Sequence, residues 1–120
     1  MTLAMRKLLA TLFALFPALA FAGGGFLAGL EDVPLPPNLA EVAGKGMVFD
    51  SPQGRIVDAD ATGEATEAQV VAFYAQTLPQ LGWTRISDTQ YRSETETLRL
   101  SIDQSRAPLL AVHYTLTPNH

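Results

Sequence analysis

The sequence predicts an α+β domain with two layers, in which one helix packs on an antiparallel sheet of five to six strands in the order β-β-α-β-β-β-β. Three observations lead to this prediction. One stretch, residues 66–81, carries apolar residues at helical spacing. The stretches before and after it alternate between apolar and polar residues, as strands with one buried face do. Short turn sequences join the alternating stretches, which favours hairpins and therefore antiparallel pairing.

The first two predicted strands, 47–50 and 55–61, form a hairpin. Between them, Ser51-Pro52-Gln53-Gly54 places proline at the second position and glycine at the fourth position of a β-turn. The second strand alternates cleanly, which predicts one buried and one solvated face. Its apolar face consists of Val57, Ala59 and Ala61, and its other face of Ile56, Asp58 and Asp60.

The helix has start and stop signals in the sequence. Thr66 and Gln69 form a capping box, which marks its start. Pro79 disfavours helical geometry at the residue before it, so the regular helix is expected to end or kink near there, and Gly82 supplies a left-handed stop. An apolar stripe is expected to face the sheet; it consists of Val70, Phe73, Tyr74, Leu78 and Leu81.

Trp83 follows the stop glycine directly and is expected to plug the core at the end of the helix. Two short strands are predicted next, at 83–86 and 90–92. Longer alternating stretches at 97–103 and 109–116 are separated by a turn and predict a terminal hairpin. The side chains expected to face the helix are Leu98, Leu100, Ile102, Leu110, Val112 and Tyr114, and Leu116 lies on the same face of its strand as the last three.

The N-terminus predicts export or membrane attachment. Arg6 and Lys7 precede an uncharged run, 8–30, and Ala20-Phe21-Ala22 has the small-x-small pattern of a cleavage site, so residues 1–22 are predicted to be a signal peptide. The alternative is that 8–30 stays in the bilayer as an uncleaved anchor, since about twenty apolar residues can span it. Either way the remainder lies outside the cytoplasm: periplasmic or secreted in the first case, tethered to the inner membrane in the second.

Residues 23–46 are predicted to be a linker. The stretch 31–46 holds three prolines and two glycines without a sustained period, which is typical of an extended spacer. The folded domain is therefore expected to span 47–117. A domain of about seventy residues buries only about 60% of its unfolded surface and is marginally stable.

The composition excludes several classes of function. The chain has 120 residues, with 8 Lys and Arg against 12 Asp and Glu, a net charge of −4 and no cysteine. This length excludes a large multidomain enzyme, and scattered basic residues in an acidic chain argue against binding to nucleic acid. The lack of cysteine excludes disulfides, thiol catalysis, cysteine-ligated metals and a lipid on an N-terminal cysteine. No cofactor is expected, membrane contact would come only through 8–30, and any partner would be an envelope protein.

No catalytic constellation is apparent, so the chain is not expected to be an enzyme. The histidines are His113, on the polar face of a predicted strand, and His120, and no serine lies in a nucleophile elbow. Ser51 fits the first position of a turn. Asp58 and Asp60 project from one face of a strand and are the candidates for sharing a divalent cation. The competing interpretation is a solvated sheet face that is kept soluble by charge.

The segments Leu35-Pro36, Asp50-Ser51 and Gly63 precede an F-Y-x3-L-P-x2-G-W stretch, which is formed by Phe73-Tyr74, Leu78-Pro79 and Gly82-Trp83. This arrangement resembles a type of small exported bacterial domain that is largely uncharacterised, and the resemblance covers Leu35 to about Ile102. Many such domains look like lipoproteins with a lipid-modified cysteine, which this chain lacks. The resemblance implies an extracytoplasmic location and a helix-on-sheet fold, and it brings no catalytic residues.

The sequence therefore predicts a non-enzymatic, exported accessory or interaction domain of the cell envelope. The alternative is an extracytoplasmic module that binds a small ligand, or a cation through Asp58 and Asp60. Strand addition to a sheet edge is a further hypothesis, and it depends on whether an edge strand is exposed. The residues expected to matter are structural: Thr66, Val70, Phe73, Tyr74, Leu78, Pro79, Gly82, Trp83, Leu98, Leu100 and Ile102.

Overall fold

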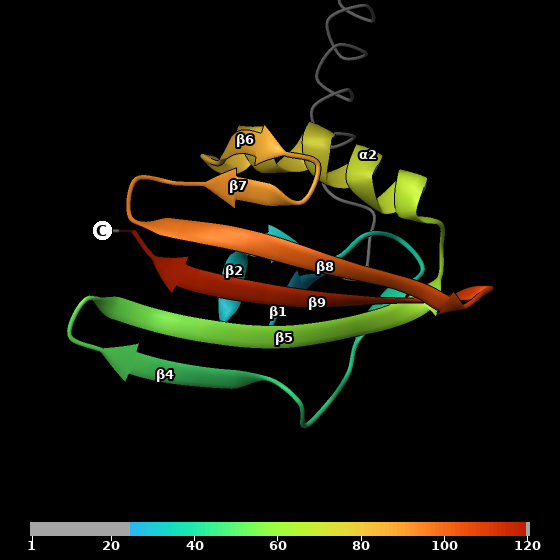
Figure 1. Ribbon diagram of the computed structural model, residues 1–120, viewed down its shortest axis with the longest axis horizontal. Coiled ribbons are helices and arrows are strands. Elements are labelled where there is room, and N and C mark those ends of the chain that lie inside the picture. The colour runs from blue at the N-terminus through green and yellow to red at the C-terminus, as the bar shows by residue number, and fades with distance from the viewer. Residues whose placement is uncertain (1–24, 120) are drawn as a thin grey trace, which may run out of the picture.

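The structure of the protein is a computed structural model that describes residues 25–119 (Figure 1). The predicted signal peptide, 1–22, and His120 lie outside the described residues. The elements in chain order are β1 (Phe26–Leu27), β2 (Leu30–Pro34), β3 (Leu39–Glu41), β4 (Met47–Ser51), β5 (Gly54–Glu64), the helix α2 (Glu67–Thr77), the 3-10 turn η2 (Leu78–Leu81), β6 (Thr84–Ser87), β7 (Gln90–Arg92), β8 (Glu96–Arg106) and β9 (Leu109–Pro118).

All strand pairs in the described chain are antiparallel, and the main sheet has seven strands. Its order is β3-β5-β9-β8-β7-β6, and β4 pairs with the same edge of β5 as β3 does. The pairing of β5 with β9 joins the first hairpin to the last. The predicted α+β class is confirmed. The sheet is larger than the five to six strands predicted, because β3 adds to the edge of β5, and β1 and β2 form a second, two-stranded sheet.

The helix begins and ends as the sequence predicts. The Gln69 N–H donates to Thr66 Oγ1 at 3.1 Å, and the Thr66 N–H donates to Gln69 Oε1 at 3.0 Å. This capping box satisfies two backbone groups that a helix start leaves without partners. After Thr77 the chain tightens into η2, which contains Pro79, and Gly82 ends it with a φ of 99°. That left-handed backbone carries no steric cost for glycine.

One face of the main sheet forms the core. Across three neighbouring strands Ala59 lies opposite Tyr114, and Tyr114 lies opposite Leu100, so their side chains project to the same side. Trp83 is buried at the corner between the helix and the sheet, as predicted. The predicted core is confirmed. Its buried members include Val57, Ala59, Ala61, Val70, Tyr74, Leu78, Leu98, Leu100, Leu110, Val112, Tyr114 and Leu116, while Phe73, Leu81 and Ile102 are partly buried against them.

The described part of the predicted linker, 25–46, is instead part of the fold, which corrects both the linker and the domain start at residue 47. It contains β1, β2 and β3, and its side chains Leu27, Leu30, Val33, Leu35 and Leu39 are buried in the core. The physical reason is that one helix of 11 residues covers only part of a seven-stranded sheet, so the remaining apolar face needs a second cover. Figure 1 shows the β1–β2 hairpin behind β5 and β9.

Two aromatic side chains attach this hairpin to the rest of the domain. The Tyr74 hydroxyl donates to the Pro34 carbonyl at 2.7 Å and accepts from the Tyr114 hydroxyl at 2.7 Å. The Trp83 Nε1–H donates to the Asp32 carbonyl at 3.3 Å. Burial raises the pKa of Tyr74 well above its usual value and that of Tyr114 to about 12. Both phenols therefore stay protonated at neutral pH and keep their hydrogen bonds.

The end of the predicted membrane anchor also belongs to the domain. Leu27 and Leu30, within the predicted anchor 8–30, are buried in the core, and the part of the anchor before Gly25 lies outside the described residues. Within 25–119, no helix is long and apolar enough to span a bilayer.

The Tyr74 hydroxyl gives a test of this arrangement. Tyr74→Phe should lower the free energy of unfolding by about 1–3 kcal/mol, because it leaves the Pro34 carbonyl and the Tyr114 hydroxyl buried without a partner. Tyr91→Phe is the matched control, since the Tyr91 hydroxyl is buried and has no hydrogen-bond partner in the described chain, although Arg85 lies near it. Urea titration measures both variants. Equal stability of the two would contradict the attachment.

Candidate functional site

The second face of the main sheet has no covering layer among residues 25–119. We call it the open face; Figure 1 looks onto it, with the β1–β2 hairpin on the far side. It carries the side chains that alternate with the core residues of β5, β9 and β8. These include Asp58, Asp60, Ser101, His113 and Thr115, all of which are exposed or only partly buried. Candidate functional side chains therefore lie on this face or along the edges of the sheet.

Asp58 and Asp60 project from one face of β5 as predicted, and His113 lies between them. His113 is directly opposite Asp60 on β9. Its Nδ1 is 2.9 Å from Asp60 Oδ1, and its Nε2 is 3.2 Å from Asp58 Oδ1. The Thr115 hydroxyl also donates to Asp58 Oδ1, at 3.2 Å. Both carboxylates are thus engaged by neighbouring side chains.

The two carboxylates change the protonation of the histidine. The hydrogen bond to Asp60 is the largest cause that raises the pKa of His113 above 6.5, and the charges of Asp60 and Asp58 add to it. Partial burial of the ring acts in the opposite direction. The imidazolium form is favoured because it can donate from both nitrogens to two carboxylates.

This arrangement is better suited to an ion pair than to catalysis or metal binding. A histidine that acts as a general base needs a free ring nitrogen, and here each nitrogen faces a carboxylate. Ser101 lies opposite His113 on β8 but makes no hydrogen bond with it. Within the described residues, no group of three or more His, Asp or Glu side chains has the geometry to hold a metal ion. A cation at Asp58 and Asp60 would have to displace His113.

β4 is an edge strand with an apolar surface. Among residues 25–119 it pairs only with β5, and Met47, Val48 and Phe49 are 48%, 56% and 53% exposed. Edge strands are commonly blocked by charges, prolines or bulges. The pairing of β4 with β5 contains no irregularity, whereas β6, at the other end of the sheet, has a register shift and an Arg85–Asp88 ion pair beside it. β4 is the less protected of these two edges.

The register fixes which backbone groups of β4 are free. Ser51 and Gly54 close a two-residue turn and must form a hydrogen-bonded pair, and such pairs alternate along the hairpin. Phe49 is therefore hydrogen-bonded to Ile56, while the N–H and C=O of Val48 point away from β5. The N–H and C=O of Asp50 point outward in the same way, so the free edge presents two donors and two acceptors, those of Val48 lying between two exposed apolar side chains.

A hollow of about 490 Å³ adjoins the same edge. It lies between the β1–β2 turn and the β3–β4 loop, and Gly29, Glu41, Gly44, Met47 and Val48 are among the residues that line it. Glu41 Oε1 accepts a hydrogen bond from the Ala28 N–H at 2.9 Å, which ties the end of β3 to the β1–β2 turn. A strand that pairs with this edge through its backbone would therefore find space in the hollow for one of its side chains.

The sequence did not predict the exposure of β4. The sequence predicts a strand at 47–50. Its one signal for an exposed apolar edge is that Met47, Val48 and Phe49 are consecutive apolar residues without alternation. Such a run is equally typical of a strand buried on both faces. The edge position follows from the pairing of β5 with β9, which turn sequences do not specify.

Comparison of the chain with protein-family models, with curated proteins and with solved structures found no match. The resemblance to small exported bacterial domains therefore stays a prediction. The residues of its F-Y-x3-L-P-x2-G-W stretch have structural positions here: Tyr74, Leu78 and Trp83 are buried, and Gly82 ends the helix. Gly63 has a structural reason too, since a Cβ there would lie 1.8 Å from the Asn38 carbonyl oxygen beside β3.

The ion pair of His113 predicts a dependence of stability on pH. Folding raises the pKa of His113. The stability that its ion pair contributes is therefore fully present below about pH 6.5 and is lost as the pH rises through the folded-state pKa. The wild type should therefore exceed His113→Gln in stability at about pH 5 by more than at about pH 8.5. The effect should stay below about 1 kcal/mol, because the side chain is 44% exposed and the pair is screened.

Melting temperatures of both proteins across this pH range measure the difference. A constant difference between wild type and His113→Gln at every pH would show that the ion pair contributes no stability.

Proposed function

We propose that this chain is a non-enzymatic interaction domain of the cell envelope, located outside the cytoplasm, and that it binds a partner protein by adding a strand to β4. The observation that carries the proposal is the free edge at Val48, whose N–H and C=O point outward between the half-exposed side chains of Met47 and Phe49. A strand that pairs there would gain backbone hydrogen bonds and cover apolar surface at the same time. The signal peptide that the sequence predicts at residues 1–22 supports the location.

The occupant that fits this edge is an extended segment with apolar and basic side chains. On the open face, apolar residues of the added strand would contact Met47 and Phe49. Glu41 lines the hollow beside Val48, and the exposed Asp50 lies on β4 itself, so two carboxylates adjoin the edge. A basic side chain in the segment would match them. A second copy of this chain fits less well, because each copy carries a net charge of −4.

The alternative of a cation-binding module is supported less well. It would use Asp58 and Asp60, whose carboxylates already bond to His113 and Thr115. An enzymatic function is likewise supported less well, since His113 has a carboxylate at each ring nitrogen.

The test places a photo-crosslinking amino acid at position 49 and, as a control, at position 86. Phe49 and Ile86 are 53% and 52% exposed, on opposite edges of the sheet. In a bacterial host, position 49 should crosslink to one envelope protein and position 86 should not. Val48→Pro should abolish this crosslink while the domain stays folded, because proline removes only the outward donor at an edge.

The identified partner is then tested with purified components. A synthetic peptide of its crosslinked segment should bind the wild type and the Ile86→Lys variant with similar affinity, and Val48→Pro and Phe49→Lys should each weaken binding at least about tenfold. Equal crosslinking at positions 49 and 86, or peptide binding that survives Val48→Pro, would overturn the proposal. A crosslink only to a second copy would assign the edge to self-association instead, and recovery of the chain from the cytoplasm alone would contradict the location.

A further inference from the structure

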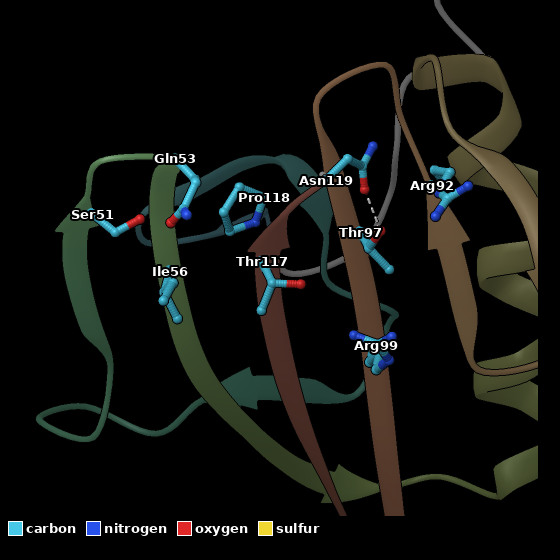
Figure 2. A pocket seen from close by; sticks show the side chains of 9 residues that line it. All are labelled: Ser51, Gln53, Ile56, Arg92, Thr97, Arg99, Thr117, Pro118 and Asn119. Atoms are coloured by element: carbon cyan, nitrogen blue, oxygen red, sulfur yellow. Dashed lines mark hydrogen bonds between the residues drawn. The ribbon is translucent and has the colours of Figure 1, made fainter.

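A second hollow lies on the open face, at the end of the sheet where β9 finishes. Its volume is about 490 Å³, and the β4–β5 turn, the last residues of β9 and parts of β7 and β8 surround it. Figure 2 shows its side chains, with Ile56 and Gln53 on one side and Arg92 and Arg99 on the other. This hollow is separate from the outer edge of β4 and from the ion pair of His113.

The charge of this hollow is opposite to that of the whole protein. Arg92 and Arg99 both line it, and no carboxylate of the described residues does, although the chain has a net charge of −4. Arg92 pairs with Thr97 on β8, and Arg99 is two residues further along the same face, so the two arginines are diagonal neighbours. The positive charges of two diagonal neighbours repel each other, and an anion between them would offset this repulsion.

The carboxylates of Glu96, Asp58 and Asp60 bond to side chains other than Arg92 and Arg99. Glu96 Oε2 pairs with Arg55 Nε at 3.0 Å, and Asp58 and Asp60 bond to His113. Neither Arg92 nor Arg99 has an ion pair or a side-chain hydrogen bond with any residue that the structure describes. Each guanidinium therefore keeps its planar set of donors available for an oxyanion.

The base of the hollow is held in place by its own hydrogen bonds. The Thr97 hydroxyl donates to Asn119 Oδ1 at 2.5 Å, as Figure 2 shows, and Asn119 Nδ2 donates to the Ser93 carbonyl at 3.0 Å. The side chains of Gln53 and Thr117 have no hydrogen-bond partner in the described chain and also line the hollow. Thr117, on β9, thus offers an uncharged donor on the floor of the hollow, and Gln53 offers donors across the hollow from the two arginines.

We propose that this hollow binds a small molecule that carries a phosphate or carboxylate group. The oxyanion lies between Arg92 and Arg99, where it neutralises both charges, and it accepts a further hydrogen bond from Thr117, while Gln53 on the opposite side donates to the rest of the molecule. The rest of the molecule lies along Ile56 and Pro118, the apolar side of the hollow. This site is independent of the proposed strand addition at β4, so each can fail without the other.

The test is a titration of the isotopically labelled chain, as recovered after expression with its native N-terminus, followed by ¹H–¹⁵N NMR. Sodium phosphate and sodium acetate are the probes, in separate titrations at constant ionic strength set with sodium chloride. Saturable shifts are expected at the Arg92 and Arg99 side-chain Nε–H groups and at the Thr117 amide, with a dissociation constant of about 1–10 mM for the preferred probe. The two titrations distinguish a phosphate ligand from a carboxylate ligand.

Arg92→Gln and Arg99→Gln should each weaken binding of the preferred probe about tenfold. Arg106→Gln is the matched control, because it removes the same charge from the far end of β8 and should change the affinity less than twofold. Shifts that do not saturate, or an equal loss of affinity in Arg106→Gln, would overturn the proposal. Val48→Pro should bind the probe as the wild type does, and a loss of probe binding in that variant would contradict the independence of the two sites.

Discussion

The arrangement of this domain depends on the hydrogen bonds among the Tyr74 hydroxyl, the Tyr114 hydroxyl and the Pro34 carbonyl. This cluster is the point where helix, sheet and N-terminal hairpin meet, and it is buried, so each polar group needs its partner. The constraint behind it is geometric. A helix of 11 residues is too short to cover the apolar face of a seven-stranded sheet, and the β1–β2 hairpin supplies the missing cover. Once that face is closed, only the open face and the edges remain for binding.

Much of the fold could be predicted because its signals are local. The capping box at Thr66, the proline at 79 and the glycine at 82 act within a few residues, and they place the helix ends correctly. The N-terminal strands have no such signal. They are two to five residues long, and prolines end β2 and separate it from β3. Contacts such as Trp83 with Asp32, 51 residues apart in the chain, fix their positions. A short proline-rich segment looks like a linker until its distant partners are known.

The candidate sites also combine a local feature that the sequence predicts with long-range features that it does not. The placement of Asp58 and Asp60 on one face follows from the period of a strand, and it was predicted. The presence of His113 between them depends on the pairing of β5 with β9, 53 residues apart, which hairpin rules leave open. The same pairing leaves β4 as an edge and brings the end of β9 beside the β4–β5 turn to form the hollow with Arg92 and Arg99. One long-range strand pairing therefore determines all of the proposed binding surfaces.

Native-state amide hydrogen exchange tests the central claim, that the N-terminal hairpin closes one face and leaves β4 open, most directly. The Leu35 amide, which donates to the Gly25 carbonyl at 2.7 Å, should exchange with the same free energy as the Leu100 amide in the main sheet, which donates to the Thr89 carbonyl at 2.9 Å. Along β4, the Phe49 amide should be protected and the Val48 amide should exchange quickly. Fast exchange at Leu35 with full protection at Leu100 would mean that this segment is a linker after all, and protection of Val48 in the isolated chain would mean that the edge is already covered.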